Sequence, residues 1–337
     1  MFDPSERDGY NDPAIYLRER LQRKGYHLST ADDNSLADCE WVLFYDANSM
    51  KISIGWKGLA RKLKANLSGK QPTRDLYNEC IRRGMKNRMA LFLWEAPAVS
   101  AANWNPELHK LFSIIFTWHD KYVDGRKFIK IHWPQTRQFP SVPKILFRDR
   151  KLLVNISMNK FASHPRELYS ARRASIKHFE RSQPQNFDLY GVGWSQPRNI
   201  LEKLLPAAKQ EYPSYKGTVK NKWDVLPKYR FSLCYENIRD EPGWVTEKIF
   251  DCMRANCVPI YWGAPNITDY VDAEAFIDRR NFKSDTELEK YIVSITEQEY
   301  DQFQAAMQTY ISGERFARFL PPAFADTIIN ALGLEKA

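Results

Sequence analysis

Short apolar runs alternate along the chain with segments whose apolar residues recur every three or four positions. This alternation predicts strands that are each followed by a helix, the pattern of a parallel α/β sheet. Residues 89–94 and 113–118 are typical apolar runs, with the length of a strand rather than of a membrane span. The sequence predicts strands over residues 26–30, 41–45, 88–94, 113–118, 151–157, 187–190, 230–236 and 258–262.

Helix boundaries are marked by capping residues. Asp12-Pro13 combines a capping side chain with proline at the first helical position, and Gly25 ends that helix. Asn105-Pro106 predicts the start of a short helix in the same way. The further helices are predicted over residues 56–67, 74–85, 164–181, 246–256, 285–293, 297–311 and 322–332.

The alternation breaks between residues 132 and 150, where Pro134, Pro140 and Pro143 lie among polar and basic neighbours. We interpret this stretch as a linker between two domains, residues 1–145 and 146–312. The helical segment 313–337 is predicted to pack back on the first domain. The expected fold is α/β, with two Rossmann-like doubly wound domains that face a cleft, and ligands of such sheets bind beyond the carboxyl ends of the strands.

Composition supports two folded domains and points to an anionic partner. The 337 residues are 43% hydrophobic, which excludes wholesale disorder and suits two domains. Lys and Arg number 50 against 41 Asp and Glu, so the formal net charge is +9. A surplus of this size favours phosphate, an acidic glycan, a membrane surface or nucleic acid as a partner.

The same sequence predicts a cytoplasmic protein. It contains no apolar run of about 18–20 residues and no apolar signal region at its start. The five cysteines are scattered and form no CxxC pair, which argues against a disulfide framework or a structural zinc site. Peripheral contact with the anionic inner membrane stays open, because basic surface residues suffice for it.

The segment 228–270 contains the largest group of candidate functional residues. Its apolar strand ends in Glu236-Asn237, and a polar loop leads to Thr246, the expected N-cap of a helix with Glu247 and Lys248 in its first turn. A helix N-terminus at the carboxyl edge of a sheet is an anion site. A cation such as Lys248 is unfavourable there unless an anionic ligand lies beside it, so this segment predicts a phosphate site.

This segment resembles the donor-binding signature of the α-1,3-fucosyltransferases, glycosyltransferase family 10. The matching elements are Tyr229-Arg-Phe-Ser-Leu-Cys-Tyr-Glu236-Asn237, Trp244-Val-Thr-Glu247-Lys248 and Val258-Pro-Ile-Tyr-Trp-Gly263. A weaker resemblance extends over residues 26–281 and includes Arg172-Arg173 and Gly191-Val-Gly-Trp194. The variant is similar to the bacterial branch, which has no membrane anchor.

The resemblance implies a GT-B fold, a GDP-fucose donor, and transfer with inversion to a glycan held by the first domain. It assigns the diphosphate to Lys248, Arg172 and Arg173 and the ribose to Glu247, while Glu236 and Asn237 lie beside sugar and phosphate. Trp244 stands where the family usually has Tyr, which keeps an aromatic face and removes a hydroxyl. The other expected donor-site residues are Val245, Thr246, Gly191 and Trp194.

The acceptor hydroxyl must lose a proton as it attacks, so a carboxylate base is needed. Glu95 is the first candidate because it follows the apolar strand 89–94, and Asp46, at the end of the strand 41–45, is its rival. In the family a glutamate of the first domain near such a strand end is the proposed base. The candidate acceptor contacts are Trp94, Trp118 and His119.

No DxD motif appears and His119, Asp120 and His132 are irregularly spaced, so no obligatory metal is expected, although a divalent ion could stimulate transfer. The expected acceptor is a GlcNAc-containing or related surface glycan, such as a lipopolysaccharide O-antigen. Two alternatives remain: a transferase that uses another nucleotide sugar, and a protein that binds nucleic acid or an anionic glycan without catalysis. The basic residues form no single block and no RRM, KH or zinc-finger motif is present, which argues against a nucleic-acid partner.

Overall fold

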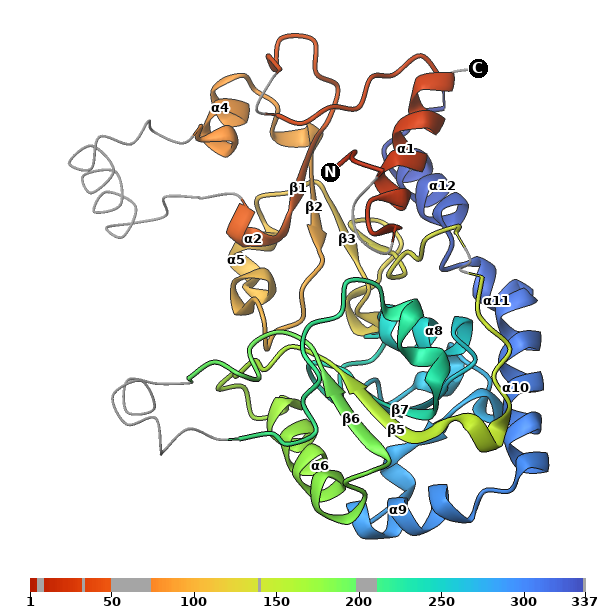
Figure 1. The fold of residues 1–337 in the computed structure, drawn as a ribbon. Coiled ribbons are helices and arrows are strands. Elements are labelled where there is room, and N and C mark those ends of the chain that lie inside the picture. Colours follow the sequence, from red (N-terminus) through yellow and green to blue (C-terminus); the bar gives the residue numbers. More distant parts are fainter. Residues whose placement is uncertain (5–8, 32–33, 50–73, 139–140, 198–210, 336–337) are drawn as a thin grey trace. The chain divides into compact units, whose positions relative to one another are not determined.

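The computed structural model describes residues 1–4, 9–31, 34–49, 74–138, 141–197 and 211–335 (Figure 1). The chain divides into two compact units. The first comprises Met1–Phe2, Ala14–His132 and Pro322–Ala337, and the second comprises Asp3–Pro13 and Trp133–Pro321. The helix predicted over residues 56–67 lies outside the described residues.

The first unit contains a four-stranded parallel sheet in the order β1-β2-β3-β4. Strand β2 is buried along its whole length, as its apolar sequence predicts. The strands are β1 (Val42–Tyr45), β2 (Met89–Leu93), β3 (Ile114–Thr117) and β4 (Phe128–Lys130). The helices are α1 (Asp12–Arg23), α2 (Asp46–Ser49), α4 (Leu76–Arg82), α5 (Pro106–His109) and α12 (Pro321–Ala331).

Alternate residues of β2 pack on opposite faces of this sheet, because successive side chains of a strand point in opposite directions. Phe92 belongs to a core cluster with Leu17 of α1 and Ile328 of α12. Leu91 belongs to a second cluster, with Cys80 of α4. Helices therefore cover both faces of the sheet.

The predicted strand over residues 26–30 is wrong, since the structure has no strand there. Tyr26 and Leu28 nevertheless pack against the core cluster of α1 and α12, so burial alternates in an extended segment that joins no ladder. Two short strands escaped prediction, β4 and β9 (Ile277–Asp278), because two or three residues carry too little alternation to be recognised.

The second unit contains a five-stranded parallel sheet in the order β6-β5-β7-β8-β9 (Figure 1). The chain passes from β5 to β6 on one side and then returns to place β7 on the other side of β5. Such a reversal is the topological switch point at which open α/β sheets bind ligands. Its strands are β5 (Lys151–Ile156), β6 (Phe187–Tyr190), β7 (Tyr229–Tyr235), β8 (Val258–Trp262) and β9.

The predicted helices of the second unit are present, with one boundary shifted by several residues, and the short helix α11 was not predicted as a separate helix. Helix α6 begins at Tyr169 instead of residue 164, because residues 164–168 form a turn and a short antiparallel bridge from Glu167 to Ile238. The helices are α6 (Tyr169–Ser182), α8 (Glu247–Arg254), α9 (Asp285–Ser294), α10 (Glu297–Ser312) and α11 (Glu314–Ala317). Single 3-10 turns occupy Lys86–Arg88, Ala101–Trp104, Asp120–Tyr122, Phe147–Asp149, Lys222–Asp224, Leu226–Lys228, Ile267–Asp269, Ala273–Ala275 and Arg279–Asn281.

Two global features of the described residues bear on the sequence analysis. None of their helices has the length and apolar character required to cross a bilayer. All five cysteines are free thiols, and four of them are buried in the two cores, where they pack as small apolar side chains.

Candidate functional site

A cavity of about 330 Å³ lies at the switch point of the second sheet. Its wall includes the carboxyl ends of β5 and β7, the loop after β6 and the first turns of α8. This volume falls at the lower end of the range for small-molecule sites. The polar or charged side chains of the wall are Asn155, Ser157, Lys160, Tyr169, Arg172, Lys222, Ser232, Tyr235, Asn237, Glu247, Lys248 and Asp251.

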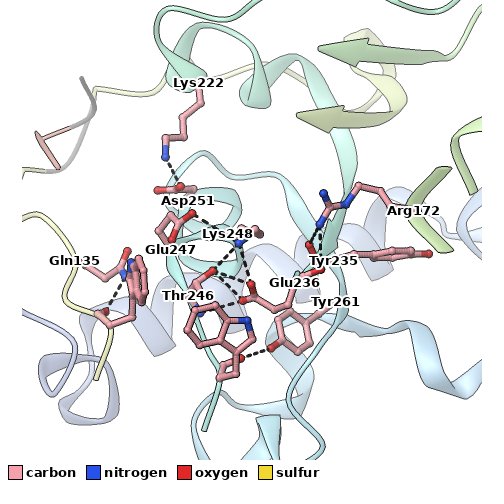
Figure 2. A network of polar contacts seen from close by, with 12 residues as sticks. Gln135, Arg172, Lys222, Tyr235, Glu236, Thr246, Glu247, Lys248, Asp251 and Tyr261 are labelled. Carbon is pink, nitrogen blue, oxygen red and sulfur yellow. Dashed lines mark hydrogen bonds and ion pairs between the residues drawn. The ribbon is translucent and has the colours of Figure 1, made fainter. Parts of the chain in front are cut away.

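The start of α8 is organised around the buried carboxylate of Glu236. Glu236 has no exposed side-chain surface and accepts hydrogen bonds from the Thr246 backbone N–H at 3.0 Å and the Thr246 hydroxyl at 2.9 Å. Lys248 Nζ donates to its Oε2 at 2.9 Å (Figure 2). Thr246 occupies the predicted N-cap position, but its hydroxyl bonds Glu236 rather than an N–H of the helix. The first N–H groups of α8 are thus left for other acceptors.

Lys248 is held as an ammonium on the cavity wall. Burial alone would lower the pKa of Lys248, but the carboxylates of Glu236 and Glu247 outweigh it, and the pKa is raised. Burial would likewise raise the pKa of Glu247, yet Lys248 and Lys222 lower it, so Glu247 is ionised. The Lys248 ammonium lies 3.8 Å from Glu247 Oε1, and its side chain keeps 27% of its surface exposed.

Arg172 of α6 brings a second cation to the same cavity. The residue is 3% exposed, and its Nη2 donates to the carbonyls of Tyr235 at 2.5 Å and Glu236 at 3.0 Å (Figure 2). Its buried Nε has no hydrogen-bond partner among the described residues. A guanidinium on a cavity wall is suited to an oxyanion such as phosphate.

The cavity brings together five of the expected donor-site residues: Arg172, Gly191, Asn237, Glu247 and Lys248. Gly191 has φ +127°, and a Cβ on it would lie 1.9 Å from the carbonyl oxygen of Ser157. Only glycine therefore allows the chain after β6 to approach the end of β5 and to form this part of the wall.

Four other expected residues lie behind the wall. Trp194 is 3% exposed and its Nε1 donates to the carbonyl of Ser157 at 2.6 Å. Trp244 is 1% exposed, and its ring meets that of Trp133 edge-on at 5.5 Å. Val245 and Thr246 are buried as well. Trp194 therefore contacts the chain after β5, whereas Trp244, Val245 and Thr246 are buried parts of the loop between β7 and α8.

Arg173, which is adjacent to Arg172 in the sequence, does not line the cavity. It is half-buried, its Nη1 donates to the carbonyl of Lys160 at 2.7 Å, and its guanidinium lies 4.0 Å from the centre of the Phe161 ring. Successive residues of a helix point about 100° apart, so only one member of the pair can face the cavity.

Sequence reasoning missed Asp251 and Lys222, which are paired on the cavity wall. Burial raises the pKa of Asp251 to about 6, although Lys222 opposes this shift. Asp251 follows Glu247 by four residues and therefore shares its helix face. That spacing was the available signal, but the partner Lys222 comes from a 3-10 turn that the sequence does not place.

In the first unit, Asp46 organises the segment that contains Glu95. Asp46 Oδ1 accepts hydrogen bonds from the backbone N–H groups of Trp94 at 2.8 Å and Glu95 at 3.1 Å, and from Asn103 Nδ2 at 2.5 Å. Burial raises the pKa of Asp46, and these donors partly oppose the shift. Asp46 thus positions the chain after β2, where the half-buried Glu95 stands near the carboxyl end of that strand.

The candidate acceptor residues are mostly inside the first unit. Trp118 is 2% exposed and His119 is 5% exposed, and their rings stack with centroids 5.3 Å apart. Trp118 Nε1 donates to the Trp94 carbonyl at 3.1 Å. Trp94 itself is half-buried, so it offers more surface than the other two. Among the described residues, no three or more His, Cys, Asp or Glu side chains form a group that could hold a metal ion.

Comparison with known proteins bears directly on the second unit, which holds the cavity. Residues 160–315 match the family model "Glycosyltransferase family 10 (fucosyltransferase) C-term". A segment of 74 residues is 40% identical to the α-(1,3)-fucosyltransferase FucT of Helicobacter pylori, and it covers 22% of this chain and 15% of that protein. A segment of 68 residues is 40% identical to an α-(1,4)-fucosyltransferase of Arabidopsis thaliana, covering 20% of this chain and 17% of the relative.

The fold is shared over nearly the whole chain. A crystal structure of an α1,3-fucosyltransferase with GDP superposes with a TM-score of 0.51 at 16% identity, and the alignment covers 96% of this chain and 97% of that one. Together with two parallel α/β units, this likeness defines the fold as that of the GT-B glycosyltransferases. Residues 160–315 are therefore similar to the fucosyltransferases of glycosyltransferase family 10, and the matched segments span less than a fifth of the length of these two relatives.

Proposed function

We propose that this protein transfers L-fucose from GDP-fucose to a hydroxyl group of a glycan, with inversion at the anomeric carbon. The observation that carries the proposal is the convergence of the buried Arg172 and the ammonium of Lys248 on one cavity at the switch point. Two fixed cations, Arg172 from α6 and Lys248 in the first turn of α8, form a site for a diphosphate. The family of residues 160–315 then supports fucose as the sugar.

In this proposal the second unit holds the donor. Arg172 and Lys248 bind the diphosphate, and the ionised Glu247 accepts hydrogen bonds from the ribose hydroxyls. As the bond between the anomeric carbon and the phosphate oxygen breaks, its electron pair leaves with GDP. The two cations stabilise that developing charge because they are already in place and need no reorganisation.

The first unit supplies the base and the acceptor contacts. Glu95 takes the proton of the acceptor hydroxyl as the oxygen forms its bond to the anomeric carbon. Support comes from Asp46, which fixes the backbone N–H of Glu95 and uses one carboxylate oxygen for three donors. Asp46 is therefore assigned a positioning role, and Glu95 is the proposed base.

The acceptor is proposed to be a GlcNAc-containing surface glycan such as a lipopolysaccharide O-antigen. The net charge of +9 supports an additional peripheral contact with an anionic membrane surface, since the two cations assigned to the diphosphate do not account for it. A panel of GlcNAc-containing oligosaccharides, tested with and without anionic vesicles, addresses both proposals.

Nucleotide preference gives the direct test of the donor. A ligand that binds only the native state stabilises it, so GDP at a hundred times its Kd is expected to raise the free energy of unfolding by about 2.7 kcal/mol. UDP at the same concentration is expected to leave Tm unchanged. Hydrolysis of GDP-fucose, GDP-mannose, UDP-galactose and UDP-GlcNAc, measured in parallel, identifies the sugar. Equal stabilisation by GDP and UDP would contradict the assignment, and preferential hydrolysis of another donor would replace fucose.

The neighbours Arg172 and Arg173 form a matched pair for testing the diphosphate site. Arg172→Gln removes a cation that lines the cavity, so the affinity for GDP is expected to fall about tenfold or more. Arg173→Gln removes the same charge one residue later, outside the wall, and the affinity is expected to stay within about twofold. Calorimetric titration with GDP measures both. Equal losses in the two variants would show that general charge, rather than the position of Arg172, determines binding.

A further inference from the structure

The charged side chains of the cavity wall follow one another in a definite order. Lys222 is paired with Asp251, and Asp251 lies one helical turn from Glu247 on α8. Glu247 in turn lies 3.8 Å from the Lys248 ammonium, whose electrostatic neighbours include Arg172. Figure 2 shows Lys222 and Asp251 at one end of this series and Arg172 at the other.

This order matches the order of parts in a nucleoside diphosphate. With the diphosphate at Arg172 and Lys248 and the ribose at Glu247, as proposed above, the base extends toward Asp251 and Lys222. The inference rests on that proposed function. The apolar side chains of Val192, Val219 and Leu226 line the same cavity and offer contact to the faces of a planar base.

The pair at this end combines two acceptor oxygens with an ammonium donor. Among the common bases, guanine alone presents two adjacent N–H donors, N1–H and the 2-amino group, beside the acceptor O6. Adenine and cytosine have one amino donor beside an acceptor nitrogen, and uracil has one N–H between two carbonyls. A carboxylate beside an ammonium is therefore complementary to the edge of guanine.

We propose that Asp251 and Lys222 recognise the guanine of the donor nucleotide. The two oxygens of Asp251 accept N1–H and the 2-amino group, and the Lys222 ammonium donates to O6. This assigns the preference for GDP to two side chains outside the Glu247–Lys248 motif. The pair also joins the 3-10 turn Lys222–Asp224 to α8, so base recognition and the position of that turn are coupled.

The burial of Asp251 supports this role. Asp251 keeps 11% of its side-chain surface exposed, and burial raises its pKa to about 6. The protein's own interactions therefore offset only part of the cost of burying the ionised carboxylate. Two additional donors from a base would stabilise the ionised form, because hydrogen bonds to a charged acceptor are stronger than those to a neutral one.

The test compares GDP with inosine diphosphate, which lacks the 2-amino group, and with xanthosine diphosphate, which has a carbonyl in its place. The wild-type protein is expected to bind GDP about tenfold more tightly than inosine diphosphate. Asp251→Asn is expected to weaken GDP about tenfold and to strengthen xanthosine diphosphate, because the amide can donate to the new carbonyl. Lys222→Met is expected to weaken GDP and inosine diphosphate by the same factor, leaving their ratio unchanged.

A gain of xanthosine diphosphate binding distinguishes recognition from a merely structural ion pair, which would weaken all three nucleotides alike. Asp224→Asn, in the same 3-10 turn but exposed and outside the wall, is the control and is expected to change none of the affinities. If Asp251→Asn fails to fold, the Lys222→Met variant still tests the contact with O6 against 6-thio-GDP. The inference is overturned if Asp251→Asn leaves the ranking of the three nucleotides unchanged, or if Lys222→Met leaves the affinity for GDP unchanged. Failure of the wild-type protein to bind GDP overturns the proposed function instead.

Discussion

Glu95→Gln is expected to leave GDP binding unchanged and to slow the cleavage of GDP-fucose, by hydrolysis or by transfer, by about 10²–10⁴-fold. The loss follows from removing a proton acceptor, since general base catalysis contributes a factor of this size. Gln keeps the shape of the side chain, and the Glu95 backbone stays held by Asp46. The expected result is a large fall in kcat with little change in Tm or in the Kd for GDP.

Glu107→Gln provides the matched control for this prediction. Glu107 is a carboxylate of the same unit, 72% exposed and paired only at the surface with Lys110, so its replacement is expected to leave turnover unchanged. Hydrolysis of GDP-fucose and transfer to GlcNAc-containing oligosaccharides are both measured, because the base would activate either water or the acceptor. Turnover by Glu95→Gln within a few-fold of the wild type would remove Glu95 from its proposed role.

Lys248→Met is expected to lower both the affinity for GDP and the stability of the protein. The affinity falls more than tenfold because a fixed cation facing the diphosphate is lost. Stability falls because Glu236, which has no exposed surface, loses its ammonium partner while it remains buried. Breaking a buried pair by removing one partner costs about 3–5 kcal/mol, and the partial exposure of Lys248 places the expected loss at the lower end.

The double variant Glu236→Gln with Lys248→Met separates these two effects. A neutral amide at position 236 removes the unpaired buried charge and can still accept from Thr246, whose N–H and hydroxyl now bond the carboxylate. Stability is expected to recover in part, whereas the affinity for GDP stays low. Chemical denaturation and titration with GDP measure the two quantities. Recovery of both together would mean that Lys248 acts only by stabilising the α8 N-terminus.

The motif in residues 228–270 shows how much of the site can be predicted from local sequence. A buried apolar strand, a polar loop and the Thr246-Glu247-Lys248 helix start predicted β7, α8 and an anion site between them, and the structure has these elements in that order. This prediction succeeds because a buried strand and a helix N-terminus are each determined by interactions within a short stretch of sequence. The extended family signature added fold class and donor type.

The positions of side chains that depend on long-range packing could not be predicted from local sequence. The sequence named Arg172 and Arg173 alike, whereas the register of α6 against β7 places only Arg172 on the cavity wall. It named Trp118 and His119 as acceptor contacts, although packing within the first unit leaves both nearly inaccessible. The local sequence around an aromatic residue near a strand end does not show whether its side chain faces solvent or the core.

Local patterns along the chain were enough to predict two α/β units, the strand–loop–helix motif at the anion site, and the resemblance of that motif to the fucosyltransferase signature. Which charged side chains share one cavity depends on long-range packing, which added Lys222 and Asp251 to the predicted set. Strands and helix starts follow from interactions between near neighbours, whereas a binding site is formed by residues brought together from β5, β6, β7, α6 and α8 when the sheet assembles.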